Sequence, residues 1–147
     1  MERQVRIRAF TAADYDQVVE LWRESGLTIK HSDTLPEIEK LLTLPANTFF
    51  VAENDIDTSS SLAIVGAVIG AWDGRRGWIY HLAVKQIAQR GGIGRQLMHA
   101  VEQALRAHGA TKINLLVEPG NQQATQFYRA LGYSAQPLQF FSKMFES

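Results

Sequence analysis

Three glycines between a predicted strand and a long predicted helix constrain this chain more than any other feature of its sequence. The turn reads Gln89-Arg90-Gly91-Gly92-Ile93-Gly94 and separates an apolar strand over 77–84 from an amphipathic helix over 92–108. Glycines let the backbone approach a ligand closely and turn several N–H groups in the same direction. At a helix start, those N–H groups and the helix dipole favour an anion, above all a phosphate. The turn therefore indicates either a phosphate cradle or a connection that only packs the helix onto a sheet.

The hydrophobic pattern predicts one mixed α/β domain over residues 1–147, in the order β-α-α-β-β-β-α-β-α-β-β. A chain of 147 residues suits a single domain, and its 46% hydrophobic and 20% charged content excludes a disordered chain. Besides the strand and helix that flank the turn, the expected strands cover 5–10, 48–52, 62–72, 113–117, 133–135 and 138–145. The remaining helices are expected from Thr11 to Gly26, from Pro36 to Pro45 and from Asn121 to Gly132, with a polar loop over 55–61.

Composition narrows the function classes. The 15 basic and 15 acidic residues give a formal net charge of zero, whereas proteins that bind nucleic acid or membrane surfaces are usually basic, so we expect neither partner. The absence of cysteine excludes disulfides, thiolate zinc sites and an acyl-cysteine intermediate. The four histidines show no metal-binding spacing, so no metal is expected. No apolar run approaches the ~18 residues of a membrane span and no signal core opens the chain, so we expect a cytoplasmic protein.

Two common phosphate-binding motifs do not fit the turn. A Walker loop places Lys-Ser/Thr after its last glycine, but Gly94 is followed by Arg95-Gln96. A Rossmann fingerprint needs a third glycine at position 97, which is Leu97 here.

Two signatures in the chain resemble those of the GNAT superfamily of acetyl-CoA-dependent N-acetyltransferases. The run 89–94 is similar to its Gln/Arg-x-x-Gly-x-Gly/Ala signature, and 81–84 (His-Leu-Ala-Val) to the strand that leads into it. About 30 residues downstream, the run Asn121-x-x-Ala124-x-x-Phe127-Tyr128-x-x-Leu131-Gly132-Tyr133 resembles the second signature. The resemblance implies a mostly antiparallel central sheet of six to seven strands, about four helices, and a splayed strand pair that holds coenzyme A.

The resemblance also implies a role for named residues. Backbone N–H groups of the turn would hold the pyrophosphate of coenzyme A, and the backbone at Leu82 and Val84 would pair with its pantetheine arm like an added strand. The implied cofactor-binding residues are Leu82, Ala83, Val84, Gln89, Arg90, Gly91, Gly92, Ile93, Gly94, Arg95 and Asn121. Tyr128 would be the general acid that protonates the departing thiolate.

The sequence does not single out one general base. Related protein N-terminal acetyltransferases carry a glutamate where this chain has Leu116, so that assignment does not carry over. Glu118 and His81 are the main candidates, since histidine titrates near neutral pH and Glu118 follows the strand beside the site. Glu53 and Asp73 are weaker ones.

The resemblance implies direct attack of a primary amine on acetyl-CoA, with a small molecule or a peptide as acceptor. The acceptor groove is expected in 22–40 and 136–145, and the six acids against one lysine in 33–57 would attract a cationic amine. The alternative is a non-catalytic CoA-binding sensor or interaction domain. A homodimer is left open, as is a longer acyl group in place of acetyl.

Overall fold

The computed structural model describes residues 5–54 and 63–146, and five strands in this part of the chain form one sheet in the order β1-β2-β3-β4-β5. The first four strands pair antiparallel, and β5 pairs parallel to β4. The strands are β1 (Val5–Ala9), β2 (Thr48–Asn54), β3 (Ala63–Trp72), β4 (Gly77–Val84) and β5 (Ile113–Leu115). The loop expected over 55–61 lies outside the described residues.

The described residues form four α-helices, the number that the sequence predicts. They are α1 (Tyr15–Glu24), α2 (Leu35–Leu41), α3 (Ile93–Ala107) and α4 (Gln122–Ala130), with 3₁₀ turns η1 (Ala12–Asp14), η2 (His31–Asp33) and η3 (Gln86–Ala88). The described chain forms two compact units, one ending at Leu116 and the other beginning at Val117. The first unit contains the whole sheet with α1, α2 and α3, and the second contains α4.

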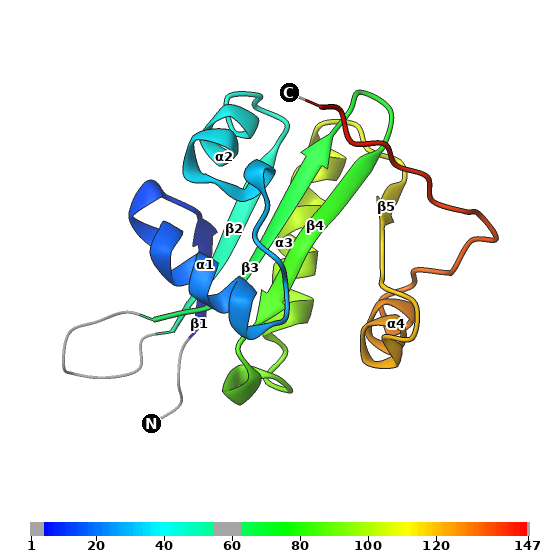
Figure 1. The fold of residues 1–147 in the computed structure, drawn as a ribbon. Coiled ribbons are helices and arrows are strands. Elements are labelled where there is room, and N and C mark those ends of the chain that lie inside the picture. The colour runs from blue at the N-terminus through cyan, green and yellow to red at the C-terminus, as the bar shows by residue number, and fades with distance from the viewer. Residues whose placement is uncertain (1–4, 55–62, 147) are drawn as a thin grey trace. The chain divides into compact units, whose positions relative to one another are not determined.

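In the first unit, α1 and α3 cover opposite faces of the sheet (Figure 1). On the α1 face, Leu21 and Trp22 are fully buried in one cluster with Ile64 and Ala67 of β3. Burying a large apolar side chain contributes about 1.5–3 kcal/mol, so this cluster fixes α1 and the segment that follows it against the middle of the sheet.

Glycines let α3 pack very close to the other face. A Cβ on Gly66 would lie 2.8 Å from Cδ1 of Leu97, and one on Gly77 would lie 2.9 Å from Cδ1 of Leu105. Gly66 pairs with Val84 at the end of β4, and Gly77 begins the same strand. The helix therefore runs back along β4, and its start lies beside the end of that strand.

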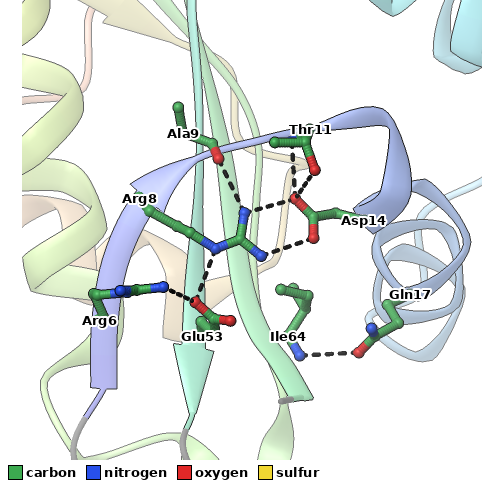
Figure 2. A network of polar contacts seen from close by, with 8 residues as sticks. All are labelled: Arg6, Arg8, Ala9, Thr11, Asp14, Gln17, Glu53 and Ile64. Carbon is green, nitrogen blue, oxygen red and sulfur yellow. Dashed lines mark hydrogen bonds and ion pairs between the residues drawn. The ribbon is translucent and has the colours of Figure 1, made fainter. Parts of the chain in front are cut away.

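A partly buried ion network ties β1 to its neighbours (Figure 2). Arg8 donates from Nη1 and Nη2 to the two carboxylate oxygens of Asp14, each at 2.8 Å, and from Nε to Glu53 at 2.8 Å. Arg6 reaches the same Glu53 oxygen at 2.8 Å, and Asp14 also accepts from the backbone N–H of Thr11, as the predicted helix start requires. The two carboxylates are almost fully buried, so this network fixes β1, η1 and β2 to one another.

The prediction of a sixth and a seventh strand is wrong. Residues 131–146 contain no strand, and β5 ends at Leu115 rather than at 117. Alternating apolar residues predicted strands over 133–135 and 138–145, but Leu138, Phe140 and Phe141 are exposed. A strand exists only where a neighbouring edge supplies hydrogen-bond partners, and side-chain pattern alone does not provide one.

Candidate functional site

The glycine turn leads directly into the start of α3. Arg90 and Gly92 both have left-handed backbone, with φ of +75° and +80°. The first bond of the helix runs from the Gln96 N–H to the Gly92 carbonyl at 3.0 Å, so the N–H groups of the three residues between them have no acceptor within the helix. A Cβ on Gly92 would meet nothing within 4 Å. The turn therefore offers several N–H donors and open space, as an anion requires.

Basic side chains accompany this turn. Arg90 and Arg95 are exposed on either side of the glycines, where each can add a charge-assisted contact to a bound phosphate. No cluster of three or more metal-ligating side chains occurs among the described residues, and no helix within the described ranges is long and apolar enough to cross a membrane.

Strand β4 loses one of its two neighbours next to the turn. It pairs with β5 only from Gly77 to Ile79, whereas it pairs with β3 as far as Val84. Opposite β3, two residues of β4, His81 and Leu82, face one residue, and His81 has a φ of +53°. This is a β-bulge, which bends the strand where β5 leaves it. In the described part of the chain, β4 therefore has no partner on the β5 side beyond Ile79, at the place where the sequence predicts a splayed strand pair.

The backbone groups of β4 face the opened edge at the two predicted residues. The Lys85 N–H donates to the Val65 carbonyl of β3 at 2.8 Å. Because backbone groups alternate between the two edges of a strand, those of Leu82 and Val84 face away from β3. The Val84 carbonyl accepts from Nε2 of Gln89 at 3.1 Å. This contact connects the end of the open edge to the first residue of the turn.

Two of the candidate bases are engaged in structural contacts. Hydrogen bonds from Arg8 and then from Arg6 hold the pKa of Glu53 below its usual range. Asp73 accepts from the backbone N–H groups of Arg75 and Arg76 in the β3–β4 hairpin, each at 2.7 Å, and the Arg76 bond leads in lowering its pKa. A carboxylate held in its ionised form by such partners is a weak proton acceptor. Neither residue is suited to the role of base.

His81 lies at the point where β4 and β5 separate, two residues beyond their last pair. Its Nε2 lies 2.8 Å from Oδ1 of Asp33 in η2, and its ring meets the Trp22 ring edge-on with centroids 5.0 Å apart. Its side chain is 26% exposed and that of Asp33 is 7% exposed. A histidine that is oriented by a buried carboxylate and still open to solvent can accept a proton from a substrate.

The second unit contains the other predicted residues. Asn121 caps α4 and accepts from the Ala124 N–H at 3.1 Å. Tyr128 is partly buried between Phe127 and Tyr133, with ring centroids 5.2 and 5.9 Å away, and burial raises its pKa to about 12. Its hydroxyl therefore carries a proton at neutral pH. Glu118 is exposed before the helix.

Sequence reasoning missed Asp33 as a site residue. It lies 48 positions before His81, in a segment whose notable sequence feature is its net acidity. No local spacing links the two residues, since packing of the α1–α2 connection against the sheet brings them together. A covarying pair in an alignment is the kind of signal that would find such a contact.

Solved structures share the arrangement of strands and helices. One is a structure of AAC(6')-Iy with a bisubstrate analogue, CoA-S-monomethyl-acetylneamine. It aligns with a TM-score of 0.77 and 15% sequence identity, and the alignment covers 96% of this chain and 99% of that chain. Another is glucosamine-6-phosphate N-acetyltransferase from Arabidopsis thaliana. It aligns with a TM-score of 0.73 and 20% sequence identity, and the alignment covers 97% of this chain and 99% of that chain. At such identities the likeness establishes the fold alone.

Sequence comparison establishes the family. The model of the acetyltransferase (GNAT) family matches residues 15–133. The acetyltransferase YE1169 of Yersinia enterocolitica is 33% identical over 132 residues, which cover 90% of this chain and 89% of that protein. The chain belongs to the GNAT acetyltransferase family, as its two signatures predict.

Proposed function

We propose that this protein is an acetyl-CoA-dependent N-acetyltransferase that transfers acetyl to a primary amine. The observation that carries the proposal is the phosphate-type cradle beside the open edge of β4, in a chain of the acetyltransferase family. Its two parts, the N–H donors at the start of α3 and the free edge of a strand, suit the pyrophosphate and the amide-bearing arm of coenzyme A.

The cradle residues divide the binding of coenzyme A between them. We assign the pyrophosphate to the backbone of residues 89–95, with Arg90 and Arg95 adding charge, and the pantetheine arm to the backbone at Leu82–Val84. Asn121 adds a contact from the capped start of α4. Because most of these contacts are made by the backbone, side-chain substitutions that neither fill space nor change charge should leave affinity nearly unchanged.

Proton movements fall to two side chains of the protein. A lysine-like amine has a pKa of ~10.4 and must lose a proton before it attacks. His81 accepts that proton before the N–C bond forms, with Glu118 as the alternative base. Acetyl-CoA supplies the thioester carbon that is attacked, and as its C–S bond breaks, Tyr128 gives its proton to the sulfur.

The acceptor proposed is a small-molecule amine. The aminoglycoside and glucosamine-6-phosphate enzymes that share the fold are N-acetyltransferases of small amines. The predicted acidic attraction is weaker than the sequence suggests, because Asp33 and Glu53 are paired with His81, Arg6 and Arg8. We therefore expect recognition by shape and hydrogen bonds more than by net charge. A peptide amine remains the competing class.

A homodimer is part of the proposal. The segment after α4 exposes large apolar side chains, namely Leu138, Phe140, Phe141, Met144 and Phe145. Clustered exposed apolar side chains are typical of contact surfaces. Light scattering coupled to size-exclusion chromatography should give twice the 16.5 kDa chain mass, and a monomer at micromolar concentration would contradict it.

A panel of amines tests the function. Purified protein is mixed with acetyl-CoA and an aminoglycoside, an amino sugar phosphate, a polyamine or a peptide, and the released thiol is followed by its reaction with a chromogenic disulfide. We expect at least one small amine to accelerate thiol release. The same assay with propionyl-CoA in place of acetyl-CoA tests the acyl group. Thermal stabilisation by coenzyme A without turnover on any amine would favour the non-catalytic sensor instead.

A further inference from the structure

A buried carboxylate far away in sequence is paired with the histidine at the open edge of β4. Asp33 is 5% exposed, and its Oδ1 lies 2.8 Å from Nε2 of His81. Burying a carboxylate is costly unless hydrogen bonds compensate. The contact therefore links the α1–α2 connection to the bulge in β4.

The position of Asp33 is itself fixed by several contacts. Its Oδ2 accepts from the Lys30 N–H at 2.9 Å, and its backbone carbonyl accepts from the Tyr15 hydroxyl at 2.9 Å. Trp22, which is fully buried, lies edge-on to the His81 ring. Both members of the pair are thus held from more than one side, which is what a precisely oriented proton acceptor needs.

The pairing sets which imidazole nitrogen is free. An ionised carboxylate can only accept hydrogen bonds, so a neutral His81 must donate from Nε2–H to Asp33. The lone pair then lies on Nδ1. No hydrogen bond of Nδ1 is found in the described part of the chain, and the side chain is 26% exposed. Nδ1 is therefore available to a substrate.

The backbone conformation at His81 is as unusual as its pairing. A φ of +53° is rare for a residue with a side chain and is retained only where the surroundings enforce it. Here the bulge and the Asp33 contact enforce this backbone conformation, at the point where β4 and β5 no longer pair. Such strained positions cluster at functional sites.

We propose that Asp33 is a positioning residue that fixes His81 in the Nε2–H tautomer, so that Nδ1 is the atom that takes the proton from the acceptor amine. This inference rests on the proposed function and on His81 rather than Glu118 as the base. In the step, the N–H bond of the attacking amine breaks and an Nδ1–H bond forms. The resulting imidazolium is stabilised by the Asp33 carboxylate, as in other carboxylate–histidine pairs.

The first test reads the tautomer and needs no substrate. In protein labelled with ¹⁵N at histidine, the ring nitrogens of His81 are assigned by their loss in His81→Gln and measured at a pH where the ring is neutral. We expect protonated Nε2 and bare Nδ1 in the wild-type protein, and the opposite tautomer in Asp33→Asn, because its amide NH₂ would donate to Nε2. Protonated Nδ1 in the wild-type protein would overturn the inference.

The second test is a kinetic double-mutant cycle with the best amine from the panel. Asp33→Asn keeps an oxygen for the Lys30 N–H and so should fold, which its melting temperature checks. We expect kcat to fall about 10–10²-fold with KM for acetyl-CoA within about twofold, and no further fall when the substitution is added to His81→Ala. The matched control Asp16→Asn, on the exposed face of α1, should leave kcat unchanged.

Each outcome separates the two ideas. Independent, additive losses from Asp33→Asn and His81→Ala would show that Asp33 acts only on stability, and would overturn the positioning role. Full kcat in His81→Ala would move the base to Glu118 and overturn the inference while leaving the acetyltransferase intact. Absence of turnover on every amine, with the expected tautomer in place, would overturn the proposed function and the proton-accepting role of Nδ1, while the Asp33–His81 tautomer would stand.

Discussion

At the scale of single residues, Gly92 has the geometry that a bound phosphate needs. Its φ of +80° suits glycine, and a side chain there would point into open space. We predict that Gly92→Asp weakens coenzyme A binding more than tenfold, because the side chain would fill that space and its charge would oppose the phosphates. Isothermal titration calorimetry on the folded variant gives the affinity.

Gly92→Asn is the matched control for charge. Asparagine has almost the same size as aspartate and tolerates left-handed backbone. It should weaken binding less than Gly92→Asp, and the gap between the two variants should narrow as salt is raised. Unchanged affinity in a folded Gly92→Asp protein would remove the pyrophosphate from this turn.

Burial of Tyr128 disfavours its ionisation. Because burial raises its pKa to about 12, the hydroxyl stays protonated throughout the physiological range and can act as an acid. We predict that Tyr128→Phe lowers kcat by about 10²-fold while KM for acetyl-CoA changes little. Steady-state kinetics measures both.

Tyr133→Phe is the control for loss of a hydroxyl in the same aromatic cluster, and its kcat should stay within about twofold of wild type. A Tyr128→Phe enzyme with full kcat would reduce Tyr128 to a packing residue. The raised pKa also predicts that alkaline loss of activity below about pH 11 does not arise from Tyr128.

At the scale of elements, the contact of α3 with the sheet depends on glycines in β3. A Cβ on Gly70 would collide with Val101 of α3 and lie 3.0 Å from Oγ1 of Thr48. We predict that Gly70→Ala lowers the free energy of unfolding by about 1–3 kcal/mol, because a packed interface cannot absorb the extra methyl group. Urea denaturation measures the change.

Gly91→Ala is the control for that substitution. Its φ is not left-handed, and its Cβ would meet only the Ala88 carbonyl oxygen at an ordinary 3.4 Å. Its unfolding free energy should stay within about 0.5 kcal/mol of wild type. An equal loss in the two variants would mean that the α3 contact is looser than the structure shows.

The ion network that joins β1, η1 and β2 should make the free energy of unfolding depend on pH in the acidic range. Hydrogen bonds from Arg8 lead in lowering the pKa values of both Asp14 and Glu53. A lowered pKa means that the folded state binds the proton less readily, so the stabilisation is present above the usual carboxyl pKa of about 4 and is lost as pH falls below it. We predict that Glu53→Gln costs about 1–3 kcal/mol at pH 7.

The difference between Glu53→Gln and wild type should shrink as pH falls below about 4, because the carboxyl of the unfolded chain takes up a proton there and that of the folded protein does so only at lower pH. Glu39→Gln, on the exposed side of α2, should change stability by less than about 0.5 kcal/mol at any pH. A gap for Glu53→Gln that is constant from pH 7 to pH 3 would show that the charge contributes nothing.

At the scale of the whole molecule, the prediction of one domain over 1–147 has a direct test. All three tryptophans lie before residue 79, so tryptophan fluorescence follows the first unit, while hydrogen exchange of the α4 amides follows the second. We predict that both report the same free energy of opening, since a single small domain unfolds cooperatively. Exchange of the α4 amides at a much lower free energy of opening would show that the chain contains two folding units.

The sequence by itself determined whatever depends on near neighbours in the chain. The helix start at Thr11–Asp14, the hairpin at Asp73-Gly74 and the glycine turn before α3 follow from local backbone preferences and hydrogen bonds, and the structure confirms them. The two family signatures are also local, which is why they identified the family.

Only the tertiary structure decided what depends on partners far along the chain. It paired Asp33 with His81 and Glu53 with Arg8, across 48 and 45 positions, and so separated one candidate base from another. It also left residues 131–146 without the strands that their pattern predicted. Side-chain pattern shows which residues can pair or be buried, but the partner that completes a strand or a charged pair is supplied by packing of the whole fold.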